Sequence, residues 1–222
     1  MKVLSFDLSL TQTGVIFAEI NDDNEITKIS SVSIVPSANE EEIIKGLGFL
    51  NSKRKVGTKK GGHWSYVKTR DEAPAYPEKK KRDVAVRNAV NIKKRESLAQ
   101  QIKLLFEKIN PELILVERNE SFNGILTTKL LAEARGILEG ACAGVEIKQY
   151  SVSEIRKNVD LITLTKEFVN KVADSGEPFP KDITKSALKH YVEDKYHIKL
   201  SNTDESDACM VLDCYLRERR AK

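Results

Sequence analysis

The first 35 residues hold three strand-like segments in close succession, and this feature constrains the fold more than any other. Residues 2–8 form a short, mostly apolar run, and two further runs follow at 14–20 and 25–35. The residues between the last two, Asn-Asp-Asp-Asn at 21–24, are typical of a hairpin turn. Strands joined by such short connections pair in antiparallel fashion. We therefore expect an antiparallel three-strand meander at the start of the chain.

Beyond residue 83, helix-like and strand-like segments alternate. Apolar residues from Val86 to Ile109 fall at helical spacing and predict a long amphipathic helix. Further elements are expected as strands at 112–117 and 145–150 and as helices at 39–49, at 124–143 and from about residues 153, 163, 182 and 204. A meander followed by this alternation predicts an α/β fold, in which parallel strands extend the meander into a mixed sheet flanked by helices.

The length of 222 residues suggests one domain, spanning 1–222, with a sizeable insertion. Hydrophobic residues make up 40% of the chain, which is enough to bury a core, and no apolar run is long enough to span a membrane. Neither the three cysteines (Cys142, Cys209 and Cys214) nor the three histidines have the spacing of a zinc or disulfide scaffold. We expect a soluble cytoplasmic protein with reduced cysteines, no membrane partner and no small-molecule cofactor.

The positive charge is concentrated in one segment. Residues 51–95 carry 15 Lys and Arg against 4 Asp and Glu, whereas the rest of the chain carries 22 against 29. Glycines and prolines, at 57, 61, 62, 74 and 77, predict that much of this segment is irregular. Such segregation of charge is typical of a protein with a polyanionic partner. The alternative is a solvated loop that only aids solubility.

Aromatic residues are interleaved with the lysines of this basic insertion. Trp64, Tyr66 and Tyr76 could stack on unpaired bases while the basic side chains bind phosphates. The candidate phosphate contacts are Lys53, Arg54, Lys55, Lys59, Lys60, Lys79, Lys80, Lys81 and Arg82. The same segment could instead form a dimer arm or become ordered only on DNA.

Two acidic residues stand at the ends of strand-like runs. Asp7 ends the first run, and Glu117 ends the apolar run Leu-Ile-Leu-Val at 113–116. One acid at a strand end is ordinary and is often a turn or capping residue. Two on candidate central strands would converge, because the site of an open α/β sheet lies at the carboxyl ends of its strands.

Two more acids lie near the start of the last predicted helix. Asp204 and Glu205 are explained by helix capping, since acids are favourable in a first turn. Asp207 is not, and with Asp204 it shares the side of the apolar residues Ala208 and Val211. Inward-facing acids need a cation, a proton or a partner. Together with Asp7 and Glu117, they predict four oxygen ligands suited to Mg²⁺ or Mn²⁺.

The order and spacing of these motifs resemble the RuvC-type Holliday junction resolvases of the RNase H-like superfamily, compact viral members in particular. Phe-Asp-Leu-Ser-Leu-Thr-Gln-Thr-Gly at 6–14 is similar to the family's Asp-Pro-Gly-x-x-x-Thr-Gly, with Leu-Ser in place of Pro-Gly. Asp-Glu-Ser-Asp-Ala at 204–208 matches the terminal Asp-x-x-Asp-Ala. Similar segments between them are Val-Glu at 116–117, Glu-Ala-Arg-Gly at 133–136, Glu-Ile-Arg-Lys-Asn-Val at 154–159 and Thr-Lys-Ser at 184–186.

The resemblance implies a homodimeric endonuclease that cuts four-way DNA junctions by paired symmetric nicks. It assigns the metal ligands as Asp7, Glu117, Asp204 and Asp207, with Lys185 as a further catalytic residue. Two Mg²⁺ ions per site, which Mn²⁺ could replace, would activate water and stabilise the leaving oxygen, giving 5′-phosphate and 3′-hydroxyl ends. The resemblance also implies a cytoplasmic protein, which for a viral member means the cytoplasm of the host cell.

Further candidate DNA contacts lie near this site. Arg156, Lys157 and Lys185 could bind phosphates beside the scissile bond, although each could also be a solvated helix charge. Phe122 follows Glu117 closely and could stack on an unpaired base, although a core phenylalanine is the commoner outcome.

Two other functions share these features. The chain could be an RNase H-like nuclease that acts on forks, flaps or RNA–DNA hybrids, since that chemistry needs the same carboxylates. It could also be a branched-DNA-binding protein without catalytic activity, although such a protein has no use for inward-facing acids.

Overall fold

The structure is a computed structural model, and it describes residues 1–222 except 41, 44–46, 48–52, 57–62, 67–75, 119–124, 158 and 222. The chain divides into two compact units. The first, which we call the sheet unit, comprises Met1–Val35 and Leu98–Lys222. The second, the insertion unit, comprises Pro36–Ser97, a range that includes the whole basic segment at 51–95.

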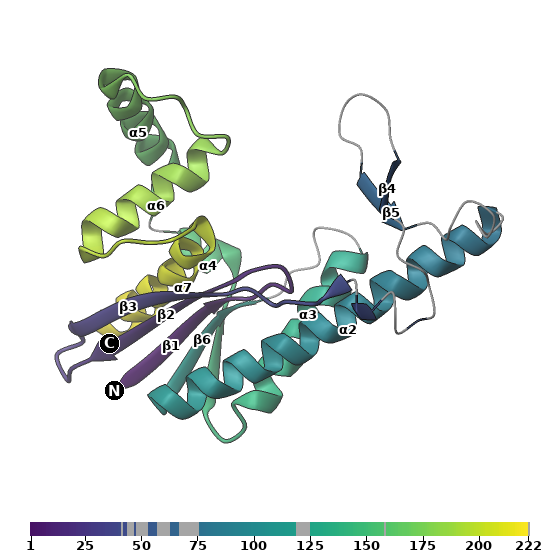
Figure 1. The fold of residues 1–222 in the computed structure, drawn as a ribbon. Coiled ribbons are helices and arrows are strands. Elements are labelled where there is room, and N and C mark those ends of the chain that lie inside the picture. Colours follow the sequence, from purple (N-terminus) through teal and green to yellow (C-terminus); the bar gives the residue numbers. More distant parts are fainter. Residues whose placement is uncertain are drawn as a thin grey trace. The chain divides into compact units, whose positions relative to one another are not determined.

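The sheet unit is built on one five-stranded mixed sheet, as the sequence predicts (Figure 1). Its strands lie in the order β3-β2-β1-β6-β7. β1 pairs with β2 and β2 with β3 in antiparallel fashion, while β1, β6 and β7 run parallel. The strands are β1 (Lys2–Asp7), β2 (Thr13–Ile20), β3 (Ile26–Ile34), β6 (Leu113–Glu117) and β7 (Glu146–Tyr150).

Alternation along the strands sends side chains to two different cores. On β1, Leu4 and Phe6 join the core formed with α3 (Ile125–Ala141) and the end of α2 (Tyr76–Ile109), while Val3 faces α7 (Thr203–Arg220). Ser5 also faces α7, because its Oγ donates to the carbonyl oxygen of Ala208 at 2.7 Å. Figure 1 shows α7 on one face of the sheet and α3 on the other. This alternation decides which face the residues at the strand ends will reach.

Helix α7 is the central helix of its core, since eleven of its residues between Glu205 and Leu216 are buried. They include Asp213, whose carboxylate accepts hydrogen bonds from Lys195 at 2.6 Å and Tyr196 at 2.7 Å. Both partners lie at the end of α6 (Ile183–Tyr196), so this buried acid ties α6 to α7. The remaining helices of the sheet unit are α4 (Val152–Arg156) and α5 (Leu161–Ser175).

The insertion unit is more regular than its glycines and prolines predict. β4 (Lys53–Val56) and β5 (His63–Tyr66) pair in antiparallel fashion, and α2 begins at Tyr76 instead of near Asp83. Pro77 does not break this helix, because it stands in the first turn, where its missing N–H has no helical partner to lose. The prediction of an irregular segment is therefore wrong for these stretches.

The candidate phosphate contacts of the basic insertion are distributed over these elements. Lys59 and Lys60 lie outside the described residues. Lys53, Arg54 and Lys55 belong to β4, and Lys79, Lys80, Lys81 and Arg82 belong to α2. Of the short helix expected at 39–49, residues 40, 42 and 43 are helical, and most of the rest lies outside the described residues.

Cys142, Cys209 and Cys214 are free and buried, as their apolar surroundings predict. Among the described residues, no helix combines the length and the hydrophobicity that crossing a membrane requires.

Candidate active site

Two acids reach the α7 face of the sheet because of strand alternation. Asp7 follows Val3 and Ser5 on that face of β1, and Glu117 follows Leu113 and Leu115, which pack in the same core. Because β1 and β6 are parallel neighbours, both acids stand at the same edge, at the carboxyl ends of the strands. The convergence of strand-end acids that the sequence suggests is therefore present in the fold.

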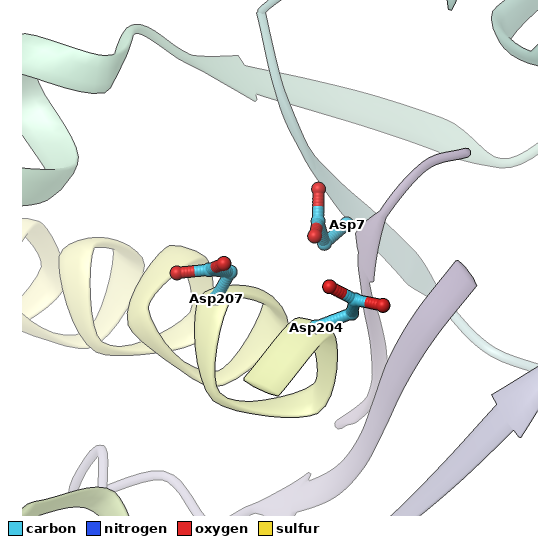
Figure 2. A group of neighbouring side chains, drawn as sticks. All are labelled: Asp7, Asp204 and Asp207. Carbon is cyan, nitrogen blue, oxygen red and sulfur yellow. The ribbon is translucent and has the colours of Figure 1, made fainter. Parts of the chain in front are cut away.

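The start of α7 brings two further acids to this edge. The side chain of Asn202 caps the helix by accepting hydrogen bonds from the backbone N–H groups of Asp204 and Glu205 at 3.0 and 3.1 Å. Asp204 and Asp207 lie three residues apart on this turn, and each side chain is 25% exposed. Figure 2 shows Asp204 and Asp207 extending from α7 beside Asp7.

Three carboxylates form a close group in the described part of the chain. One oxygen each from Asp7, Asp204 and Asp207 lies within 4.8 Å of the other two. Glu117 is not a member of this close group, but it lines the same cavity of about 260 Å³ as Asp7 and Asp207. The four acids singled out in the sequence therefore gather at one place, with Glu117 at its margin.

The crowding of acids shifts their protonation. Burial is the largest reason why the pKa of Asp7 rises from 3.8 to about 8, and the charges of Asp207, Glu117 and Asp204 raise it further. Burial also raises the pKa of Asp207, against the lowering effect of Lys185. The surroundings of Asp7 thus favour either a proton on its carboxyl group or a cation beside it.

Lys185 is the cation that the fold brings to the carboxylates. Its Nζ lies 3.3 Å from Asp207 Oδ2 and 3.9 Å from Asp204 Oδ1. It stands in the first turn of α6, where Asp182 caps the helix by accepting from the Lys185 backbone N–H at 3.0 Å. Burial lowers the pKa of Lys185, but the neighbouring carboxylates, Asp207 foremost, outweigh this effect and raise it.

The other predicted DNA contacts divide into three cases. Arg156 lines the cavity, and its charge slightly opposes the rise that burial causes in the pKa of Asp207. Lys157 is the exposed C-cap of α4 and is not among the cavity-lining residues. Phe122 lies outside the described residues.

Helix capping does not fully explain Glu205. This residue does lie in the first turn of α7, but its side chain is 0% exposed. Ser33 Oγ donates to its Oε1 at 2.6 Å, the Ser201 N–H donates to its Oε2 at 2.8 Å, and the Asn202 amide contacts Ser33. Glu205 therefore ties β3 to the start of α7. Local sequence gives no sign of this role, because the donor Ser33 lies on a distant strand.

The loop after Asp7 is closed without the Pro-Gly pair of the family pattern. Thr13 Oγ1 donates to the Ser9 carbonyl oxygen at 2.8 Å and accepts from the Ser9 N–H at 3.0 Å. The buried Thr13 thus closes the turn between β1 and β2, and Gly14 follows it directly opposite Asp7.

The group of carboxylates fits a hard divalent cation. All its donors are oxygens, they come from two rigid elements, and they lie within reach of one ion. Burial and, after it, repulsion from the neighbouring acids raise the pKa of Asp7, and a bound cation would relieve the repulsion. Asp7, Asp204 and Asp207 could therefore hold a metal ion, and Glu117 lines the same cavity as Asp7 and Asp207.

No protein-family model matches the chain, and no curated protein matches it in sequence. In structure it is similar to Thermus thermophilus RuvC in complex with a Holliday junction substrate, with a TM-score of 0.51 and 12% identity over 99% of this chain and 96% of that chain. A second Thermus thermophilus RuvC structure gives a TM-score of 0.50 and 13% identity over 100% and 97%. The chain therefore has the RNase H-like fold of RuvC, as its motifs predict.

Proposed function

We propose that this chain is an endonuclease that resolves four-way DNA junctions by paired symmetric nicks. The observation that carries the proposal is the convergence of Asp7, Asp204 and Asp207 at the carboxyl ends of parallel strands, in a chain with the fold of RuvC. RuvC has been solved with a Holliday junction substrate, which makes branched DNA the first substrate to test.

The acids would hold two Mg²⁺ ions, for which Mn²⁺ could substitute. Bound there, divalent ions supply a Lewis acid that makes water a nucleophile at neutral pH and stabilises charge on the leaving oxygen. Asp7 and Asp207 would bind from the two sides of the site, one on β1 and one on α7, with Glu117 completing the ligands from β6.

The other cavity-lining side chains fit phosphodiester hydrolysis. The described lining of the cavity includes acidic and basic side chains, and in this proposal the attacking group is a water molecule that the divalent ions would activate. Water adds to phosphorus and the bond to the 3′ oxygen breaks, which leaves a 5′-phosphate and a 3′-hydroxyl. Arg156 and Lys185 would bind the phosphate oxygens and orient the scissile bond.

Symmetric cutting requires two sites, so we propose that the chain acts as a homodimer. The basic insertion would add phosphate contacts along the arms of the junction, because residues 51–95 carry 15 Lys and Arg and only 4 acids. Lys157 and Phe122, next to the site in sequence, would contribute a further phosphate contact and a stacking surface.

A panel of labelled substrates tests this function against its rivals. Four-way junction, fork, flap, RNA–DNA hybrid and linear duplex are incubated with the protein and Mg²⁺, and the cut positions are mapped on each strand. We expect paired nicks at symmetric positions of the junction. If only the hybrid or only the flap is cut, the assignment of the active site stands and the proposed substrate is wrong. Tight binding of the junction without cutting in Mg²⁺ or Mn²⁺ would favour a binding protein.

A further inference from the structure

The ammonium group of Lys185 lies next to two of the carboxylates that would bind a cation. It lies 3.3 Å from Asp207 and 3.9 Å from Asp204, two of the three members of the close carboxylate group. Asp7, the third member, also attracts it. Lys185 therefore contributes positive charge directly beside acids that would bind metal.

We propose that Lys185 is a built-in competitor of the divalent ion, displaced from the carboxylates when metal binds and held away from them by a DNA phosphate. This inference rests on the proposed function and adds to it a coupling between metal binding and DNA binding.

Simple electrostatics requires the displacement. A divalent ion held by Asp204 and Asp207 would stand within a few ångströms of the present Nζ position. Like charges at so short a separation repel strongly, and more so where the surrounding protein keeps water out. The ammonium and the ion therefore do not share the site, and the metal affinity of the free protein includes the cost of moving the lysine.

The geometry of Lys185 permits the movement. Its side chain is 47% exposed, and a lysine carries its charge on a flexible four-carbon stem. Thr184, Lys185 and Arg156 line the same cavity, so a phosphate bound beside Arg156 could accept the displaced ammonium. The backbone of Lys185 meanwhile stays fixed by the Asp182 cap, so only the side chain has to move.

The consequence is positive coupling between the two ligands. A phosphate that engages Lys185 vacates the carboxylates for metal, and by linkage a bound metal frees Lys185 for phosphate. Metal would then bind weakly to the free protein and more tightly to its complex with DNA.

The test compares Lys185→Met with Lys189→Met, its matched control. Lys189 lies one turn further along α6 and pairs with Glu193 at 3.9 Å, outside the carboxylate group. Methionine keeps the length of the stem but offers a cation no oxygen ligand. Mn²⁺ binding to the DNA-free protein is measured by calorimetry, with Asp7→Asn marking binding to this site, and circular dichroism confirms that each variant is folded.

We expect Lys185→Met to bind Mn²⁺ roughly tenfold more tightly than the original protein, and Lys189→Met to stay within about twofold of it. Unchanged affinity in Lys185→Met, while the original protein binds Mn²⁺ and Asp7→Asn does not, overturns the competition and leaves the proposed function intact. Absence of Mn²⁺ binding in every variant overturns both.

Coupling is measured with a labelled four-way junction in Ca²⁺ or in EDTA, after a gel shows the junction uncut. We expect Ca²⁺ to strengthen junction binding by a larger factor in the original protein than in Lys185→Met. Equal factors in the two proteins would overturn the part of the proposal in which phosphate holds the lysine away.

Discussion

Gly14 on β2 lies so close to the first turn of α7 that a Cβ added to it would stand 2.1 Å from the carbonyl oxygen of Asp204. Gly14 is also the register partner of Asp7. The strand residue opposite one candidate ligand therefore sets how closely the helix bearing another ligand can approach. The absence of a side chain at position 14 is a condition for the whole carboxylate group.

We predict that Gly14→Ala pushes α7 away from the sheet, because backbone atoms cannot yield as a flexible side chain can. Overpacking of this kind costs about 1–3 kcal/mol. Gly136 on α3 is the matched control, since a Cβ there meets nothing within 4 Å. Urea denaturation should show a clear loss of stability for Gly14→Ala, whereas Gly136→Ala should match or exceed the original protein. Equal stability of the original protein, Gly14→Ala and Gly136→Ala would contradict the close contact between Gly14 and the backbone of α7.

The stability of the protein should depend on pH because the pKa of Asp7 is raised in the folded state. The pKa of Asp7 rises from 3.8 to about 8 on folding, so the folded protein holds a proton that the unfolded chain releases. In metal-free buffer this contribution to stability is complete below about pH 4, declines as the pH rises, and is lost above about pH 8. Asp7→Asn has no such proton and should be the more stable protein at about pH 9.

Thermal unfolding in EDTA at about pH 5 and about pH 9 measures this effect, with each kcal/mol shifting the Tm by about 2–4 °C. Added Mg²⁺ should recover stability in the original protein and leave Asp7→Asn little changed. A parallel decline of the two proteins with pH would show that Asp7 is not the group responsible.

Ser33 should contribute to the stability of the protein and to metal binding, because it donates a hydrogen bond to the buried carboxylate of Glu205. Ser33→Ala removes the donor to Glu205 Oε1 and should cost about 1–3 kcal/mol, as expected when a charged group loses a hydrogen bond. Ser30, an exposed serine of the same strand, is the control and should change stability by less than about 0.5 kcal/mol. Because the hydrogen bond anchors the first turn of α7, Ser33→Ala should also weaken Mn²⁺ binding. If Ser33→Ala and Ser30→Ala have the same stability and the same affinity for Mn²⁺, the hydrogen bond between Ser33 and Glu205 does not hold the first turn of α7 in place.

The basic insertion should govern the salt dependence of junction binding. Replacing residues 52–82 by a Gly/Ser linker removes eleven Lys and Arg and three acids. For every phosphate that the protein no longer neutralises, the negative slope of log K against log[salt] should become shallower by about 0.9. Fluorescence anisotropy over a salt series measures the slope. An unchanged slope would assign the segment to solubility alone.

Much of the site could be predicted from local patterns. The run from Lys2 to Asp7 is short and mostly apolar, which predicts a strand, so an acid at its end marks the carboxyl edge of the sheet. The same holds for Glu117, and the three-residue spacing of Asp204 and Asp207 places both on one side of a helix. Sheet topology then follows from connection lengths, because parallel strands need the helical crossovers that the sequence contains.

What could not be predicted depends on contacts between distant segments. The approach of Lys185 to Asp207 joins two helices through tertiary packing, and the burial of Glu205 depends on a serine 172 residues away. Gly14 shows no local sign that it faces a helix backbone. Helix α2 also starts earlier than the sequence suggests. The sequence predicts that Pro77 breaks a helix, but a proline in the first turn has no helical hydrogen bond to lose.

Cleavage of a labelled four-way junction in Mg²⁺ by the original protein and by Asp207→Asn tests the central claim most directly, with binding of the same junction measured in parallel. Asp207→Asn keeps the shape of the side chain and removes a charge that faces phosphate. We predict that the original protein makes paired symmetric nicks and that the cleavage rate falls by at least about 100-fold in Asp207→Asn. The affinity of the variant for the junction should be equal or higher. Retained Mg²⁺-dependent cutting by Asp207→Asn would contradict the assignment of this carboxylate group as the active site.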